Sequence, residues 1–138
     1  MGLRHSGREA AVKILYSIEF SDNQPDAALS DYWLNHKASA KYKEFTLRLV
    51  KGVTEKRPEI DNMINSASKN WPIGRIAEID KNIIRLAVYE LIGCNEVPTA
   101  VAINEAVELA KQYSGGKSAA FINGILGEIQ EGFKKETT

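Results

Sequence analysis

Apolar residues recur about every 3.6 positions along almost the whole chain, the period that places them on one face of an α-helix. Near the start they form a clear stripe, made of Ala11, Ile14, Leu15 and Ile18. The sequence has no alternating run of β-branched residues leading into a tight hairpin turn, so paired strands are not expected. The pattern predicts an all-α fold, a compact helical domain of about seven helices.

Prolines and glycines mark where these helices are interrupted. Pro58 breaks an apolar run because its ring disfavours continuation of a helix, so one helix should end before it and another begin there. The stretch NWPIGR at 70–75 combines a proline with a glycine and is the expected joint between two halves. We predict a single domain over 1–138, with an N-terminal bundle at about 1–69 and a C-terminal bundle at about 71–133.

The fifth predicted helix, over residues 76–92, is apolar around about two thirds of its circumference and has to be surrounded by other helices. Its clearly polar sector contains only Asn82, Arg85 and Tyr89. Glu90 falls inside the apolar arc, where a carboxylate needs a cationic or hydrogen-bonding partner. We therefore predict a structural ion pair at Glu90.

Composition restricts the kind of protein further. The chain has 138 residues and is 43% apolar, enough for one compact core. Lys and Arg together number 18, as do Asp and Glu, so a site for a polyanion has to come from local clustering of cations. The single cysteine, Cys94, excludes an internal disulfide. With no membrane-length apolar run and no secretory signal pattern, the expected location is the cytoplasm.

Residues 115–118, GGKS, resemble the end of a phosphate-binding loop, but the full motif is missing. The motif needs a glycine where this chain has Lys111, and it needs a preceding strand where this chain has a helix. His5 and His36 lie far apart, and no metal-ligand spacing or hydrolase elbow occurs. We expect no enzyme activity, no catalytic residue, no metal and no cofactor.

The same segment suits binding without chemistry. The first amides of the last helix carry partial positive charge, Lys117 adds a full charge, and Ser118 is a good N-cap residue. Phe121 projects beyond the buried stripe of that helix, where its ring could stack on an unpaired base. The alternatives are an ordinary cap with a solvated lysine and a phenylalanine that packs on a neighbouring helix.

A second cationic group lies at the other end of the chain. Arg4, His5 and Arg8 precede or open the first helix, and we interpret them as a flexible arm that can curl around a ligand. Asn104 and Glu105, in the sixth helix, lie on its polar side and are interpreted as solvated surface.

Three blocks of the sequence closely resemble the NusB transcription antitermination factors. They are IDKNIIRLAVYEL at 79–91, VPTAVAINEAVELAKQY at 97–113 and SAAFINGIL at 118–126, and the first helix, REAAVKILYSIEF, is also similar. The blocks occur in order at plausible spacing, and the likeness spans nearly the whole chain.

The resemblance implies two three-helix bundles packed across one another and a non-enzymatic adaptor. Such proteins pair with the small-subunit ribosomal protein NusE and bind the single-stranded boxA element of nascent RNA. In this way the RNA polymerase antitermination complex reads through terminators in ribosomal RNA operons. Whether the free protein forms a homodimer is left open.

The resemblance also assigns roles to particular residues. An arginine-rich arm and the start of the last helix touch RNA in the family, and two further positions are associated with the partner protein. The matching RNA-binding residues are Arg4, His5, Arg8, Lys117, Ser118 and Phe121, and the partner-binding residues are Tyr16 and Asp80. The arm has fewer arginines than in many relatives, which implies weaker binding of RNA by the free protein and more dependence on the partner.

A rival interpretation is a helical protein–protein interaction module that never touches nucleic acid. It would use an exposed face of the fifth or sixth helix, and the zero net charge of the chain favours it.

Overall fold

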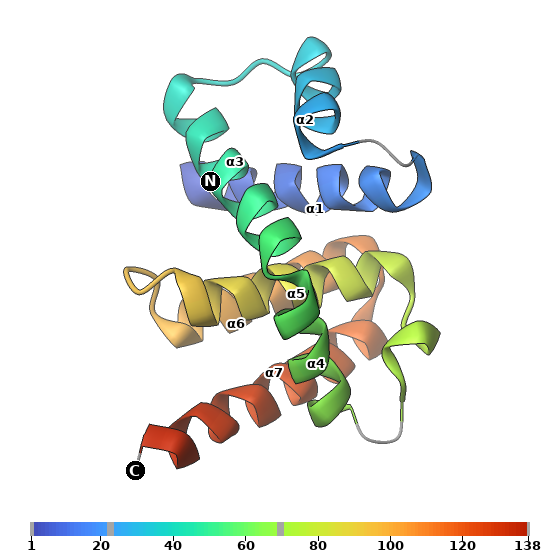
Figure 1. The fold of residues 1–138 in the computed structure, drawn as a ribbon, viewed down its shortest axis with the longest axis vertical. Helices are drawn as coiled ribbons and strands as arrows, with labels where there is room; N and C mark the ends of the chain where they lie inside the picture. The colour runs from blue at the N-terminus through green and yellow to red at the C-terminus, as the bar shows by residue number, and fades with distance from the viewer. Residues whose placement is uncertain (1, 22–23, 69–70, 138) are drawn as a thin grey trace.

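The computed structural model describes residues 2–21, 24–68 and 71–137, and over these residues the chain is all-α, with seven α-helices, one short 3₁₀ helix and no strand (Figure 1). This confirms the predicted fold class. The elements are α1 (Leu3–Ser21), α2 (Pro25–Leu34), α3 (Ala40–Glu55), α4 (Arg57–Ala67), η1 (Ile73–Arg75), α5 (Glu78–Gly93), α6 (Thr99–Tyr113) and α7 (Gly116–Thr137).

Local sequence signals account for several helix starts. Pro25 opens α2 and Pro58 lies in the first turn of α4. Backbone N–H groups in the first turn have no acceptor within the helix, so a proline there costs no hydrogen bond. Ser39 caps α3 because its side-chain oxygen accepts a hydrogen bond from the Tyr42 backbone N–H at 3.2 Å. The predicted break at Pro58 is confirmed, since α3 ends at Glu55 and α4 begins at Arg57.

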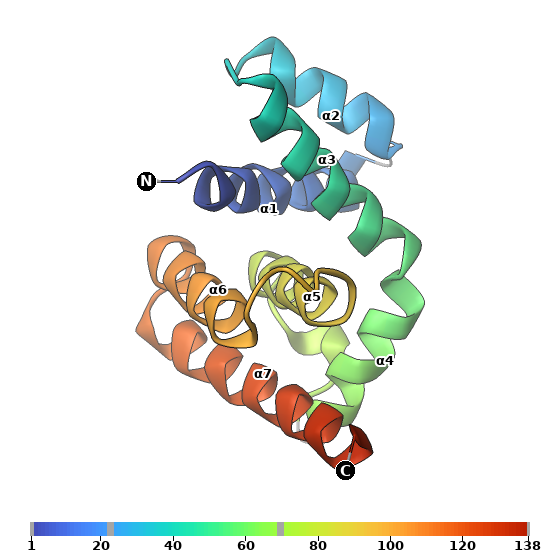
Figure 2. The ribbon, with the colours of Figure 1, turned by 90° about the vertical axis from the view of Figure 1, so that its left-hand side faces the viewer.

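Helix α5 is surrounded, as its apolar circumference requires. It packs against α1, α3, α4, α6 and α7 (Figure 2). Ile83, Ile84 and Leu86 are fully buried on it, and burial of each such side chain stabilises the fold by about 1.5–3 kcal/mol.

The polar sector of α5 is buried as well, and Arg85 shows how this is possible. Its Nε and Nη2 donate to the two carboxylate oxygens of Asp61 at 2.8 and 3.1 Å, and its Nη1 donates to Glu19 at 3.3 Å. The buried guanidinium thus ties α5 to α4 and α1, and its charge is compensated.

The helices form two groups (Figure 2). The first three, α1 to α3, pack on one another, and α5 packs with α6 and α7. By its contacts α4 belongs with α5 and α7, although a boundary near residue 70 places it in the N-terminal half. The division into two three-helix bundles stays a prediction.

Two glycines leave room for the Tyr89 ring where α3 packs against α5. The Tyr89 ring lies against Gly52 of α3 and Gly93 of α5, and a Cβ added at Gly52 would lie 2.1 Å from Tyr89 Cζ. A side chain at Gly52 would therefore overlap a buried ring.

Helix α1 lies along α6 in the same direction. His5 Nδ1 is 2.8 Å from Glu105 Oε2, and one turn further along α1 Glu9 accepts hydrogen bonds from Gln112 and the Tyr113 hydroxyl, both at 2.8 Å. These contacts hold the start of α1 near the middle of α6. They also hold the second turn of α1 at the end of α6.

We expect the contact between Glu9 of α1 and the end of α6 to weaken in acid. Burial raises the pKa of Glu9, but hydrogen bonds from Tyr113 and Gln112 and the charge of Lys13 outweigh burial, so the pKa lies below its ordinary 4.5. A carboxyl whose pKa is lower in the folded chain stabilises the fold above pH 4.5, and this contribution is lost as the pH falls through the lowered value. Urea unfolding between pH 6 and pH 3 should therefore depend less on pH in Glu9→Gln. An unchanged pH dependence in that variant would contradict the assignment.

Candidate functional site

A cavity of about 530 Å³ at the start of α7 brings together side chains from three segments of the chain. It is lined by Trp71, Arg75, Ile76, Ala77, Asp80, Lys117, Ser118 and Phe121. Four residues to which the sequence assigned binding roles, three for RNA and one for a protein partner, therefore share one surface.

The turn into α7 is held by Asp80. Gly115 has a φ of 113°, a left-handed conformation that favours glycine, and lets the chain reverse between α6 and α7. Ser114 and Ser118 donate their hydroxyls to the two carboxylate oxygens of Asp80, at 2.6 and 2.9 Å. The buried Asp80 carboxylate thus anchors the turn onto α5, and Lys117 is exposed between the two serines.

One expectation about this turn needs correction. Helix α7 begins at Gly116, so Ser118 lies within its first turn and donates to Asp80 instead of capping the helix. Asp80 is buried and both its oxygens accept hydrogen bonds from the serines, so in the structure it positions the turn, and its partner-binding role stays a prediction.

Phe121 packs on its neighbours, as one of the two alternatives expected, and its stacking role stays a prediction. Its ring is half-buried and packs against the core, and it also borders the cavity. The sequence analysis assigned no role to two other lining residues, Trp71 and Arg75. The signal that could have found them is an aromatic residue and a cation in the stretch at 70–75, which also contains a proline and a glycine.

The predicted flexible arm is wrong, because α1 already begins at Leu3. Arg4 is exposed, and its guanidinium carbon lies 5.6 Å from the centroid of the Phe45 ring. His5 is partly buried against Glu105 of α6, so Glu105 is not simply part of a solvated face.

Arg8 is an interior residue, which is the main departure from the sequence analysis. Its Nε donates to both carboxylate oxygens of Glu90, at 2.9 and 3.0 Å. Arg8 and Glu90 are each 2% exposed. The predicted ion pair at Glu90 is confirmed, with Arg8 as its partner. Burial raises the pKa of Glu90, while the bonds from Arg8 oppose the rise.

The two predicted RNA-binding groups lie apart. Arg4 is next to the His5–Glu105 contact, whereas Lys117 follows the end of α6 at Tyr113. The stretch of α6 from Glu105 to Tyr113 is about 12 Å long at 1.5 Å per residue, so a ligand touching both groups must run along α1 and α6. Lys13, which the sequence analysis did not single out, lies on this path with its ammonium 5.8 Å from the Tyr113 ring centroid.

Tyr16 is exposed on α1, as a partner-binding residue has to be. Its ring lies 4.7 Å from the ring of Phe20, which is 64% exposed. The two rings form an aromatic pair on the surface of α1.

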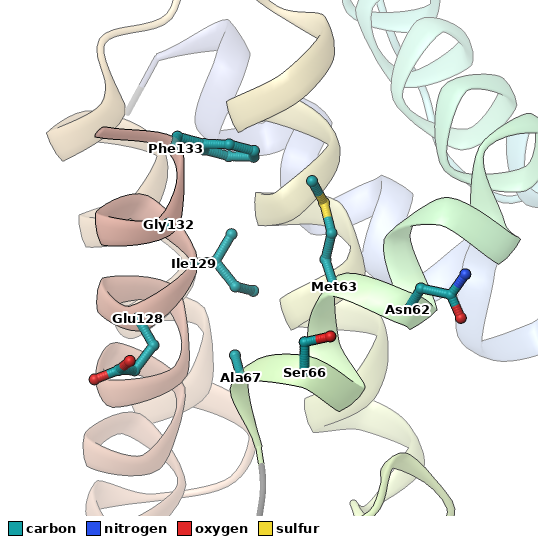
Figure 3. A pocket seen from close by; sticks show the side chains of 8 residues that line it. All are labelled: Asn62, Met63, Ser66, Ala67, Glu128, Ile129, Gly132 and Phe133. Atoms are coloured by element: carbon teal, nitrogen blue, oxygen red, sulfur yellow. The ribbon is translucent and has the colours of Figure 1, made fainter. Parts of the chain in front are cut away.

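A second cavity, of about 380 Å³, lies between α4 and α7 (Figure 3). Met63, Ile129 and Phe133 supply apolar surface, and the charged group among its lining residues is Glu128. Because a polyanion needs cations, this cavity does not suit nucleic acid.

Residues 5–131 match the model of the NusB family. The chain belongs to the NusB family. The transcription antitermination protein NusB of Geobacter sulfurreducens is 46% identical over 131 residues, which cover 94% of each chain.

Solved NusB structures agree with the fold. T. maritima NusB superimposes with a TM-score of 0.86 and 35% identity, covering 93% of this chain and 90% of that one. A crystal structure of antitermination factors NusB and NusE in complex with dsRNA has a TM-score of 0.85 and 27% identity, covering 96% of this chain and 98% of that one.

Membership in the NusB family confirms the expectation of a protein that is not an enzyme, because NusB proteins are antitermination factors. Within the described part of the chain, no helix is long and apolar enough to cross a membrane.

Proposed function

We propose that this chain is a transcription antitermination factor that binds boxA-type single-stranded RNA together with ribosomal protein NusE. In this role it promotes read-through in ribosomal RNA operons, as a cytoplasmic component of an RNA polymerase antitermination complex. Support for antitermination comes from the names of its curated relatives, and support for binding of NusE and RNA comes from the similar structure of NusB and NusE in complex with dsRNA.

The observation that carries the RNA-binding part is the cavity at the start of α7. Lys117 and Arg75 supply positive charge for phosphates, and Phe121 supplies an aromatic ring. Asp80 keeps the α6–α7 turn in place through its two serine hydrogen bonds, so the cation and the ring are held before RNA arrives. Lys13 adds a cation on the side of α1 that faces Tyr113 of α6, whereas Arg4 lies over Phe45 of α3.

The partner-binding part relies on the aromatic pair of α1. Tyr16 and Phe20 are both exposed, and exposed aromatic residues are enriched at protein interfaces. We place the contact with NusE there, and we assign Asp80 an indirect part in it through the turn that it anchors.

A salt titration tests the cationic contacts. Each phosphate contact to single-stranded RNA contributes about −0.7 to the slope of log affinity against log salt, so Lys117→Gln should flatten the slope by about 0.7. Lys37→Gln removes an exposed cation from the connection between α2 and α3 and should leave the slope unchanged (Figure 1). Equal slopes for the two variants, measured by fluorescence anisotropy, would reject Lys117 as a contact.

A second experiment separates this function from that of a protein-only module. We expect the assembly of protein, NusE and boxA-like single-stranded RNA to be tighter than either pairwise complex, and tighter than the assembly with the matching duplex. Binding to NusE with no RNA binding in any mixture would favour the interaction module, which the exposed pair Tyr16 and Phe20 also suits.

A further inference from the structure

We propose that Trp71 is a stacking platform for an unpaired nucleobase and that its indole forms, with Phe121, the aromatic part of a nucleotide pocket. This inference rests on the RNA-binding function proposed above and assigns it a residue that neither the sequence motifs nor the comparisons identify. Trp71 is 49% exposed and lines the same cavity as Phe121.

The indole is held in place by its own loop. Its Nε1–H donates to the Arg75 carbonyl at 3.1 Å, and the Trp71 backbone N–H donates to the Ser68 carbonyl at 3.0 Å. The Asn65 side-chain oxygen accepts a hydrogen bond from the Ile73 backbone N–H at 3.1 Å, which ties the loop to α4. An aromatic ring fixed in this way loses little conformational freedom when a ligand binds.

The same hydrogen bond decides what the ring can offer to a ligand. Nε1 is the only polar atom of an indole, and it is already satisfied by Arg75. The half-exposed ring of Trp71 therefore presents apolar π surface, which suits stacking and not hydrogen bonding. Every base has a π face, so such a contact is largely independent of sequence.

The surroundings favour a nucleotide over an apolar peptide. Exposed Arg75 and Lys117 lie on the cavity together with the two aromatic residues, and cations beside stacking rings are the combination that binds single-stranded nucleic acid. The carboxylate in the lining, Asp80, has both oxygens engaged by serine hydroxyls. The cavity between α4 and α7 has apolar residues and Glu128 but lacks such cations.

Intrinsic fluorescence gives a direct test, because the chain has two tryptophans. Trp33→Phe leaves Trp71 as the only indole, and Trp33 lies in α2, away from the cavity. We expect single-stranded RNA to quench the fluorescence of Trp33→Phe in parallel with binding, followed independently by anisotropy of labelled RNA. Addition of NusE alone should leave the fluorescence unchanged.

Affinity measurements complete the test. Trp71→Ala should weaken RNA binding about 5- to 150-fold, the effect typical of losing one stacked base, and Trp71→Phe should retain most of the affinity. Trp33→Phe is the matched control and should bind RNA like the unchanged protein. Thermal unfolding of each variant verifies that it is folded.

The outcomes are distinguishable. RNA binding with unchanged Trp71 fluorescence and unchanged affinity in Trp71→Ala overturns the stacking role and leaves the RNA-binding function intact. Quenching by NusE and not by RNA makes Trp71 a protein contact, which also overturns the proposal. Absence of RNA binding by anisotropy, with and without NusE, overturns both the stacking role of Trp71 and the proposed RNA-binding function.

Discussion

Replacement of Glu90 by alanine should lower the free energy of unfolding by about 3–5 kcal/mol, because it removes the carboxylate bonded to the buried Arg8 guanidinium and leaves Arg8 the longer contact from Nη1 to Glu105, at 3.9 Å. Both residues are 2% exposed, and Arg8 donates to both carboxylate oxygens. Urea unfolding followed by circular dichroism at neutral pH measures the loss.

An exposed ion pair supplies the control. Lys111 Nζ lies 3.5 Å from Glu108 Oε1 on the surface of α6. Glu108→Ala should lower the free energy of unfolding by less than about 1 kcal/mol. The double variant Arg8→Met with Glu90→Leu removes both charges and should recover most of the stability that Glu90→Ala loses. A loss for Glu90→Ala as small as that for Glu108→Ala would mean that the buried pair is not a structural element.

The same double variant separates the two roles considered for Arg8. A residue of a flexible RNA-binding arm would reduce RNA affinity when replaced and leave stability unchanged. A buried residue that joins α1 to α5 has no contact with RNA, so the double variant should keep its RNA affinity. Arg4→Gln, which changes the exposed arginine of the same helix, should weaken RNA binding and leave the unfolding transition in place.

Replacement of Gly52 by alanine should destabilise the protein by about 1–3 kcal/mol, the usual cost of an overpacked core. The added Cβ would lie 2.1 Å from Tyr89 Cζ, and the Tyr89 ring also lies against Gly93, so it has little room to move away. Substitution by valine, which is larger, should cost more.

Gly124 provides the matched control for this substitution. It is also a glycine within an α-helix, but a Cβ added there meets nothing within 4 Å. Gly124→Ala should therefore stabilise the protein by about 0.5–1 kcal/mol, because alanine favours the helix. In a Tyr89→Leu background the loss caused by Gly52→Ala should shrink, and an undiminished loss would show that the ring is not the cause.

Local patterns in the sequence were sufficient for the helices. The 3.6-residue period depends only on neighbours along the chain, and prolines act on the turn in which they lie. The break between α3 and α4 and the enclosed position of α5 were therefore predictable. The need for a partner at Glu90 was predictable too, because a carboxylate on an apolar helix face has to be compensated wherever the helix packs.

The identity of partners was decided by the tertiary structure. Arg8 and Glu90 are 82 residues apart, and an arginine near a helix start has the same sequence signature whether it meets solvent or a buried carboxylate. The interpretation as a flexible arm failed for that reason.

The candidate site shows the same division between sequence and tertiary structure. Lys117 and Phe121 could be selected from the sequence because they follow a glycine pair and leave the apolar stripe of α7. Trp71 belongs to a loop that only helix packing brings to the start of α7. The chain by itself thus determined its helices and the need to compensate the Glu90 carboxylate, because both follow from local spacing and burial. Packing alone decided which distant side chains meet, since those contacts depend on how the helices cross.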